Sequence, residues 1–211
     1  MTTSHTGQNF RILFVCTGNI CRSPFAQFLT DSLIKARLRP VDADRFVVGS
    51  AGIEALPGAR IDVLAHAELA RRGLAGSAAE FRARRLQPET AANADLVLTA
   101  DRDHRSAVVH LAPSALRKTF CIREFARHIR DIPPVGLPPH PVDRATRLVA
   151  LAAQRRGAVC YATEHDDTIP DPRGRSAAVH RSMAETIASA ITPFVGRLAE
   201  PVMETPARET V

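Results

Sequence analysis

The residues best suited to chemistry lie in one ten-residue run near the start of the chain, VCTGNICRSP at positions 15–24. Cys16 offers a thiol, whose thiolate form is a strong nucleophile. Arg22 follows after five residues and carries a planar set of donors that matches two oxygens of a phosphate group. A Cys and an Arg at this spacing are a weak signal by themselves, because 26 of the 211 residues are Arg. The prediction therefore depends on the residues between them and on the surrounding elements.

The intervening residues suit a loop that wraps around an anion. Gly18 permits close approach of the backbone or a positive φ, and Asn19 tolerates the left-handed region and can tie the loop with its amide. The backbone N–H groups of a curled loop of this length can converge on a phosphate. Their positive field and that of Arg22 favour the thiolate of Cys16, to which Ser23 can donate its hydroxyl. The predicted phosphate-binding residues are Thr17, Gly18, Asn19, Ile20, Cys21 and Ser23.

The flanking elements place this loop at the N-terminus of a helix. Residues 10–16 (FRILFVC) form an apolar run that predicts a buried strand. Pro24 marks the first position of a helix, and apolar residues then recur at helical spacing through Leu33. Free N–H groups and the helix dipole would then face the loop and make an anion site. The structural alternative is a buried cysteine followed by a helix-capping loop.

The rest of the chain alternates strands with helices. Further strands are predicted at residues 45–50, 95–100 and 118–122. Helices are predicted at 61–72, 142–152 and 179–191. One more helix follows the strand at 95–100 and runs through Leu111, and another follows the strand at 118–122 and runs to about Arg130. This alternation favours an α/β fold with a parallel sheet covered by helices on both faces. Gly73 is the expected stop of one helix, and Pro193 is expected to end or kink the last.

Two stretches do not fit the alternation. Residues 132–141 are rich in proline and residues 157–175 are polar, and both are expected to form loops. We expect a single domain over residues 10–200, preceded by a flexible N-terminus at 1–9 and followed by a flexible tail at 201–211.

Composition argues against several other classes of protein. No apolar run approaches the roughly 18–20 residues of a membrane helix, and the polar N-terminus lacks the basic region of a secretory signal. We therefore expect a cytoplasmic protein with no membrane partner. The arginines are scattered and aromatic residues are few, which argues against nucleic-acid binding, whereas the net charge of +6 favours acidic or phosphorylated partners.

Cysteine and histidine spacing predicts no metal site and no disulfide scaffold. Cys16, Cys21, Cys121 and Cys160 are too scattered for either, in a chain where no secretory signal is visible. The eight histidines show no metal-ligand spacing, and solvent-facing or structural roles are expected for them. Cys121 is expected to be a core residue.

Taken together, these features resemble the low-molecular-weight protein-tyrosine phosphatases. Residues 15–24 resemble the family signature, Ser50-Ala51-Gly52 resembles its Ser-Ala-Gly, and residues 81–84 and 99–101 resemble two further family segments. Asp171-Pro172 resembles its general-acid loop. The resemblance implies a four-stranded parallel sheet flanked by helices. It covers about residues 10–130 and 168–192, which leaves residues 131–167 as a helical insertion.

The resemblance also implies a mechanism. Cys16 would attack phosphorus, Arg22 and the loop would hold the phosphate oxygens, and Asp171 would protonate the leaving oxygen before activating water. Ser50 would help to hold Asn19. No metal or other cofactor is required. Other acids lie close to Asp171 in sequence (Glu164, Asp166 and Asp167), and Asp171 could instead cap the helix that follows it.

Three positions bear on the substrate. Members of the family that cleave phosphoarginine carry Thr where this chain has Ile20, so Ile20 favours phosphotyrosine. Arg173 replaces an aromatic residue that usually flanks the phenyl ring, and Leu56 is the apolar residue nearest the place of a usual Trp. Arg173 and Arg175 could favour acidic residues around the phosphotyrosine, or be solvated loop charges.

The resemblance leaves several alternatives open. An arsenate reductase of the same fold would need a thiol relay, and residues 73–120 contain no cysteine. A phosphoarginine phosphatase and a non-catalytic phosphate-binding protein are further alternatives. The expected partner is a phosphotyrosine-containing protein, in bacteria often a tyrosine autokinase. In the family, the pair equivalent to Cys16 and Cys21 can form a reversible disulfide.

Overall fold

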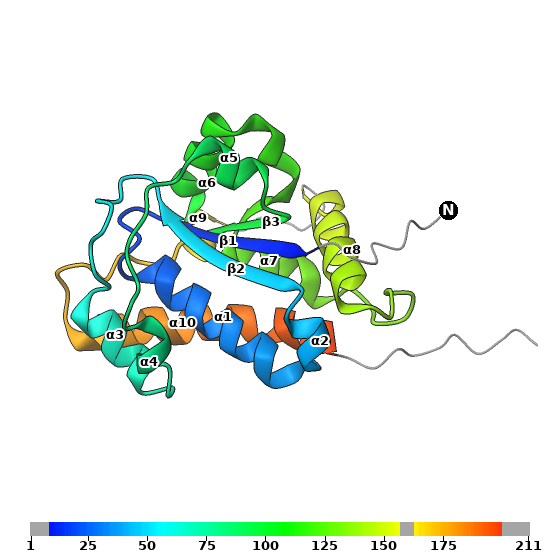
Figure 1. The fold of residues 1–211 in the computed structure, drawn as a ribbon. Helices are drawn as coiled ribbons and strands as arrows, with labels where there is room; N and C mark the ends of the chain where they lie inside the picture. Colours follow the sequence, from blue (N-terminus) through cyan, green and yellow to red (C-terminus); the bar gives the residue numbers. More distant parts are fainter. Residues whose placement is uncertain (1–8, 157–162, 200–211) are drawn as a thin grey trace, which may run out of the picture.

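The computed structural model describes residues 9–156 and 163–199, and its centre is a four-stranded parallel sheet (Figure 1). The strands lie in the order β2-β1-β3-β4, and every pair is parallel. Their bounds are β1 Phe10–Cys16, β2 Phe46–Gly52, β3 Leu96–Thr99 and β4 Thr119–Cys121. The four predicted strands are therefore confirmed, with ends that differ by one or two residues.

Side chains of β1 alternate between two hydrophobic clusters, which lie on the two faces of the sheet. Phe10, Ile12 and Phe14 belong to the larger cluster, whereas Leu13 and Val15 belong to the smaller one. Because both sets are buried, the strand is apolar from Ile12 to Cys16, as is typical of a parallel sheet covered on both faces, and only Arg11 near its start is exposed. The predicted α/β architecture is confirmed.

Helices cover both faces (Figure 1). On one side α1 (Arg22–Arg37), α3 (Val63–Ala70) and α10 (Ala177–Ala199) pack against one another. On the other side lie α5 (Pro88–Ala92) and α6 (Arg102–Leu111). The remaining helices are α2 Pro40–Ala43, α4 Ala75–Ala78, η1 Pro113–Lys118, α7 Ile122–Arg130, α8 Pro141–Gln154 and α9 Glu164–Asp167.

One prediction about proline was wrong, and one of the two outcomes expected at Pro193 did not occur. Helix α1 begins at Arg22, so Pro24 is its third residue and not its first. Helix α10 does not end at Pro193 but continues to Ala199. The physical reason is the apolar face beyond the proline, where Phe194 and Leu198 are buried against the core while Pro193 itself points to solvent. Packing of that face outweighs the lost hydrogen bond.

The predicted helical insertion contains α8, close to the expected residues 142–152, and its buried Arg144 ties it to the rest of the fold. The guanidinium donates to the carbonyls of Pro138 (2.8 Å), Arg197 (3.1 Å) and Leu198 (3.3 Å), so it also caps the end of α10. The expected polar loop at 157–175 contains α9 in its described part.

Predictions for residues 1–8, Cys160 and 200–211 lie outside the described residues. No helix in the described ranges has the length and apolar character needed to cross a membrane.

Candidate active site

The predicted phosphate loop lies at the carboxyl end of the sheet, between β1 and α1. The parallel register sets Cys16 beside Gly52 of β2 and Val15 beside Thr99 of β3, so three strands end at this edge. The Cys16 side chain is buried, and its Sγ lies 2.9 Å from Ser23 Oγ in a hydrogen bond. A hydroxyl at this distance can donate to a thiolate, as the sequence predicts for Ser23.

Asn19 organises the loop. Its φ of 53° places it in the left-handed region. Its Nδ2 donates to Ser23 Oγ (2.9 Å) and to Ser50 Oγ (2.8 Å), and its Oδ1 accepts from the backbone N–H of Arg84 (2.9 Å). Ser50 in turn donates to Gln27 Oε1 (2.6 Å). These bonds tie the loop to β2, to α1 and to the segment of Arg84, as the sequence predicts for the Asn19 amide.

The protein contacts require glycine at Gly52, and Gly18 does not have the positive φ that was one of its two expected roles. The φ of Gly18 is not in the left-handed region, and a Cβ there would meet only the Ile20 side chain, at 3.6 Å. Asn19 supplies the left-handed residue instead. A Cβ on Gly52 would lie 2.4 Å from the carbonyl oxygen of Thr17 and 2.8 Å from the Asn19 nitrogen. The end of β2 therefore packs directly on the loop backbone.

The guanidinium of Arg22 is buried at the centre of the site. Its Nη2 lies 2.9 Å from Asp171 Oδ2 and donates to Thr17 Oγ1 (3.1 Å), while its Nη1 donates to the carbonyl of Ile169 (3.2 Å). Nη1 is also 3.7 Å from Asp101 Oδ2. The fold thus brings Asp171 to Arg22 across 149 positions of sequence, from 22 to 171.

Sequence reasoning did not single out His104, which connects two of these residues. Its side chain is buried, with Nε2 2.9 Å from Thr17 Oγ1 and Nδ1 2.5 Å from Asp101 Oδ1. Burial alone would raise the pKa of Asp101, but the contacts with His104 and the charge of Arg22 lower it below its ordinary value. Asp101 therefore remains a carboxylate that orients Arg22. Only the distance between α6 and the loop, which the sequence does not contain, could have revealed this role.

Two of the acids that compete with Asp171 in sequence, Asp166 and Asp167, make other contacts in the structure. Asp167 is buried and pairs with Arg102 Nη2 (2.6 Å) and Arg127 Nη2 (2.5 Å). Asp166 accepts hydrogen bonds from the backbone and hydroxyl of Thr163. The Asp171 carboxylate is 46% exposed, and besides Arg22 it accepts a hydrogen bond from the Arg173 backbone (3.1 Å). That second contact is a local turn of the loop and not the helix cap that the sequence left open, because α10 begins only at Ala177.

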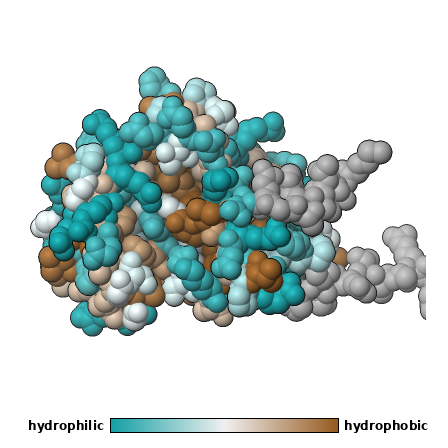
Figure 2. Space-filling view, in the orientation of Figure 1, coloured by the Kyte–Doolittle hydropathy of each residue, from teal (hydrophilic) through white to brown (hydrophobic). Residues whose placement is uncertain are grey.

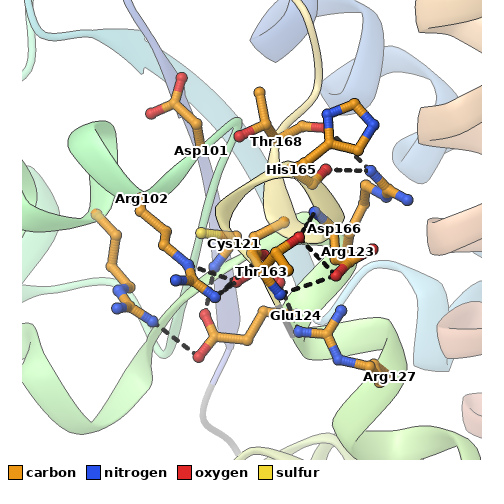
Figure 3. Close-up of polar contacts among 12 residues, drawn as sticks. Asp101, Arg102, Cys121, Arg123, Glu124, Arg127, Thr163, His165, Asp166 and Thr168 are labelled. Atoms are coloured by element: carbon orange, nitrogen blue, oxygen red, sulfur yellow. Dashed lines mark hydrogen bonds and ion pairs between the residues drawn. The ribbon is translucent and has the colours of Figure 1, made fainter. Parts of the chain in front are cut away.

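An arginine cluster holds the segment that precedes Asp171 (Figure 3). Arg123 donates to the carbonyls of His165 (3.0 Å) and Thr168 (3.1 Å), beside the Arg102 and Arg127 contacts to Asp167. Ile169 then donates its N–H to the carbonyl of Ala100 (2.8 Å). These contacts fix α9 and the following residues against α6 and α7, and so place the loop that carries Asp171.

The segment between β2 and α3 packs against the phosphate loop. Three of its N–H groups bond to carbonyls at the phosphate loop: Ile53 to Cys16 (3.0 Å), Glu54 to Thr17 (2.9 Å) and Asp62 to Ile20 (2.9 Å). Leu56 and Val63 project from this region with exposed fractions of 74% and 81%. Figure 2 shows separate apolar spots among hydrophilic side chains at the end of the molecule where this segment runs in Figure 1.

The other described cysteines are buried, and both have raised pKa values. Burial is the main cause at Cys21, with further contributions from the charges of Asp62 and Asp171, and its pKa is about 12. Burial likewise raises the pKa of Cys121 on β4 to about 12, and that side chain is fully enclosed. The prediction that Cys121 is a core residue is confirmed.

The phosphate loop at the strand ends, with a thiol and a guanidinium buried in it, defines a cysteine-dependent phosphatase. The sequence matches the family described as low molecular weight phosphotyrosine protein phosphatase over residues 11–134, more than half of the chain, so the chain belongs to this family. The predicted family is confirmed.

Individual relatives agree with this assignment. The chain is 36% identical over 116 residues to a protein-arginine-phosphatase of Geobacillus stearothermophilus, covering 55% of this chain and 71% of the relative. It is 34% identical over 122 residues to the low molecular weight protein-tyrosine-phosphatase Etp of Escherichia coli K12, covering 58% of this chain and 74% of Etp.

Solved structures show the same fold. A low molecular weight protein tyrosine phosphatase from T. tengcongensis superposes with a TM-score of 0.63 at 26% identity, covering 90% of this chain and 99% of that one. A YwlE mutant from Bacillus subtilis superposes with a TM-score of 0.64 at 20% identity, covering 91% and 100%.

Proposed function

We propose that this phosphatase hydrolyses phosphotyrosine in proteins through a phosphocysteine on Cys16, with Arg22 as the phosphate clamp and Asp171 as the general acid. The observation that carries the proposal is the contact of Arg22 with Asp171, beside a Cys16 thiol that is hydrogen-bonded to Ser23. These are the residues that the mechanism requires, and they come from the two ends of the domain.

The first chemical step transfers the phosphoryl group to sulfur. The Cys16 thiolate attacks phosphorus in line with the leaving oxygen, so an S–P bond forms as the P–O bond breaks. Asp171 gives its proton to the departing phenolic oxygen. Arg22 and the loop N–H groups carry the charge of the equatorial oxygens. Because Arg22 contacts Asp171 in this structure, a phosphate dianion would take over the guanidinium and release the carboxyl group.

The second step returns the enzyme to its starting state. Asp171, now a carboxylate, removes a proton from water, and the water oxygen attacks phosphorus as the S–P bond breaks. Inorganic phosphate leaves and the Cys16 thiolate is restored, with the Ser23 hydroxyl as its hydrogen-bond donor. The chemistry of both steps is supplied by side chains and backbone of the chain.

The walls of the site favour an aromatic leaving group. Leu56, on the segment bonded to the phosphate loop, and Val63, the first residue of α3, are exposed apolar side chains, and Ile20 within the loop is half-buried. The leaving group of phosphoarginine is instead a guanidinium, which becomes cationic. Arg173 and Arg175 are exposed just after Asp171 and would repel that product.

Phosphoarginine is the second candidate substrate, because one relative with 36% identity is named a protein-arginine-phosphatase. The deciding experiment compares kcat/KM for phosphotyrosine and phosphoarginine placed in one peptide sequence. We expect a preference for phosphotyrosine, and we expect Ile20→Thr to move the ratio toward phosphoarginine. Val47→Thr, on β2 at the opposite end of the sheet, serves as the matched control. A preference for phosphoarginine in the unmodified enzyme would reverse the assignment.

The physiological substrate is proposed to be a phosphotyrosine-containing protein such as a bacterial tyrosine autokinase. The exposed Arg173 and Arg175 suit acidic residues near the phosphotyrosine. Replacing both by alanine should raise KM for a peptide with acidic flanks and leave KM for a peptide with neutral flanks unchanged. Equal effects on the two peptides would remove this part of the proposal.

A further inference from the structure

Three side chains that are far apart in sequence meet beside the phosphate loop, although sequence spacing indicated no metal ligands. They are Cys21 at the start of α1, Asp62 at the start of α3 and His180 in α10. One thiol sulfur, one carboxylate oxygen and one imidazole nitrogen of this set all lie within 4.8 Å of one another. The three helices pack side by side on one face of the sheet (Figure 1).

His180 is oriented as a metal-binding histidine would be. Its ring is 1% exposed, and its Nδ1 lies 3.1 Å from the carbonyl oxygen of Ser176. A carbonyl only accepts, so Nδ1 must carry the proton, and the neutral ring then presents the lone pair of Nε2. A backbone carbonyl on the far nitrogen is the usual support of a ligating histidine.

Nε2 itself lacks a hydrogen bond. It lies 3.1 Å from Asp62 Oδ1, but it is a buried nitrogen without hydrogen-bond geometry to any partner in the described part of the chain. Asp62 Oδ1 already accepts from the N–H groups of Leu64 (2.9 Å) and Ala65 (3.1 Å) as the cap of α3. A lone pair directed at a carboxylate oxygen is unfavourable unless a proton or a cation lies between them.

The donor set determines which cation fits. A thiolate, an imidazole and a carboxylate are the ligands of zinc, at about 2.0–2.3 Å, which sets ligand atoms about 3.5 Å apart in a tetrahedron. A contraction of at most about 1.3 Å, from the limit of 4.8 Å, brings the most distant pair to that separation. Asp62 is 26% exposed and gives an ion access from solvent, and the negative charges of Asp62 and Asp171 both act at Cys21.

We propose that Cys21, Asp62 and His180 bind a divalent zinc-like cation, with the fourth coordination position open to water. Because Cys21 is also a residue of the phosphate loop, the ion would tie that loop to α3 and α10. The Cys21 thiol would lose its proton to solvent as the metal–sulfur bond forms, so no electron transfer is involved. Its ligands do not include Cys16, Arg22 or Asp171, the residues proposed to carry the phosphatase reaction.

Cobalt(II) is the probe, because a bound thiolate produces a charge-transfer absorption that nitrogen and oxygen ligands do not. The titration is made in a Cys16→Ser background, which removes the nucleophile as a competing thiol. We expect the thiolate band in this background and its loss when Cys21→Ser is added. Zinc should displace cobalt, and either ion should raise the melting temperature.

His180→Phe and His180→Gln, each in the same background, test the histidine. Both should weaken cobalt binding by about 100-fold or more, because substitution of a residue that only supports a metal ligand already lowers metal affinity by about 10–100-fold. His110→Phe, an exposed histidine of α6, is the matched control and should bind as its parent. Melting without metal verifies that each variant is folded. A cobalt spectrum without the thiolate band, or unchanged affinity in both folded His180 variants, would overturn the proposal whether or not the chain is a phosphatase.

Discussion

The buried contact between Asp167 and two arginines offers a sharp test of how the acid loop is positioned. Asp167 is the last residue of α9 and lies four residues before Asp171. It does not touch Arg22 or the phosphate loop in any described contact. Its carboxylate pairs with Arg102 at 2.6 Å and with Arg127 at 2.5 Å. Asp167→Asn keeps the shape of the side chain and removes its charge.

The expected loss can be worked out from these contacts. A hydrogen-bonded contact with a charged group contributes about 1.5–3 kcal/mol, and the contacts with both arginines are weakened. The two arginine side chains are 35% and 24% exposed, so water replaces part of each interaction. The lower end of the range, about 1.5 kcal/mol for each arginine, therefore applies, which gives a loss of about 3 kcal/mol. If this free energy is lost from the ordered state of the loop that carries Asp171, the fraction of molecules with Asp171 in its productive position falls by up to about 100-fold.

The assay uses two aryl phosphates whose leaving groups differ in acidity. Phenyl phosphate needs the proton from Asp171, whereas p-nitrophenyl phosphate leaves readily without it. We expect Asp167→Asn to lower kcat for phenyl phosphate by 10-fold to 100-fold and to affect p-nitrophenyl phosphate much less. Inhibition by inorganic phosphate, which depends on Arg22 and the loop, should stay close to that of the unmodified enzyme.

The neighbouring Asp166→Asn is the matched control. Asp166 bonds to Thr163 and not to a buried arginine, so its substitution should leave both substrates unaffected. Equal losses of kcat on the two substrates after Asp167→Asn, or no loss on either, would refute the reasoning that this pair positions the general acid.

Three further predictions follow from contacts in the site and its surroundings. Gly52→Ala should cost about 1–3 kcal/mol of stability and strongly reduce turnover, because the new Cβ would lie 2.4 Å from the Thr17 carbonyl oxygen. Gly49→Ala is the control, because its Cβ would make ordinary contacts only. A urea titration and a rate assay should show that this control is tolerated. Ser50→Ala removes one of the two acceptors of Asn19 Nδ2 and the donor to Gln27 Oε1. It should destabilise by about 1–3 kcal/mol and weaken phosphate inhibition, and an unchanged inhibition constant would contradict this prediction. Burial opposes ionisation of Glu124, but His128, the Cys121 N–H and nearby arginines lower its pKa from 4.5 to about 2. The contribution of Glu124 to the free energy of unfolding is therefore present above pH 4.5 and lost as the pH falls toward 2. Urea titrations of Glu124→Gln should show a flatter dependence of stability on pH in this window.

Local sequence patterns predicted the strands and the phosphate loop because the determinants there are close in sequence. The run from Val15 to Pro24 contains the thiol, the left-handed Asn19 and the arginine together, and its position after an apolar strand fixes its place at the sheet edge. The resemblance to a known family added Ser50 and Asp171, which no local pattern could have connected to Cys16.

The remaining features depend on distances that only the fold creates. His104 reaches Thr17 from α6, and His180 reaches Cys21 and Asp62 from α10, so neither histidine has a sequence neighbour that reveals its partner. The continuation of α10 past Pro193 depends on the packing of Phe194 and Leu198 against the core, which outweighs the local preference. The requirement for glycine at Gly52 also comes from the fold, because the end of β2 packs on the loop backbone.

The most direct test of the central claim is phosphate release from a phosphotyrosine peptide by the unmodified chain beside Cys16→Ser, under reducing conditions and with a chelator present. The account predicts sustained release by the unmodified chain and none by the variant, which should still bind inorganic phosphate through Arg22 and the loop. Release by folded Cys16→Ser at an undiminished rate would contradict the phosphocysteine mechanism, and absence of release from the unmodified chain would contradict phosphotyrosine as its substrate.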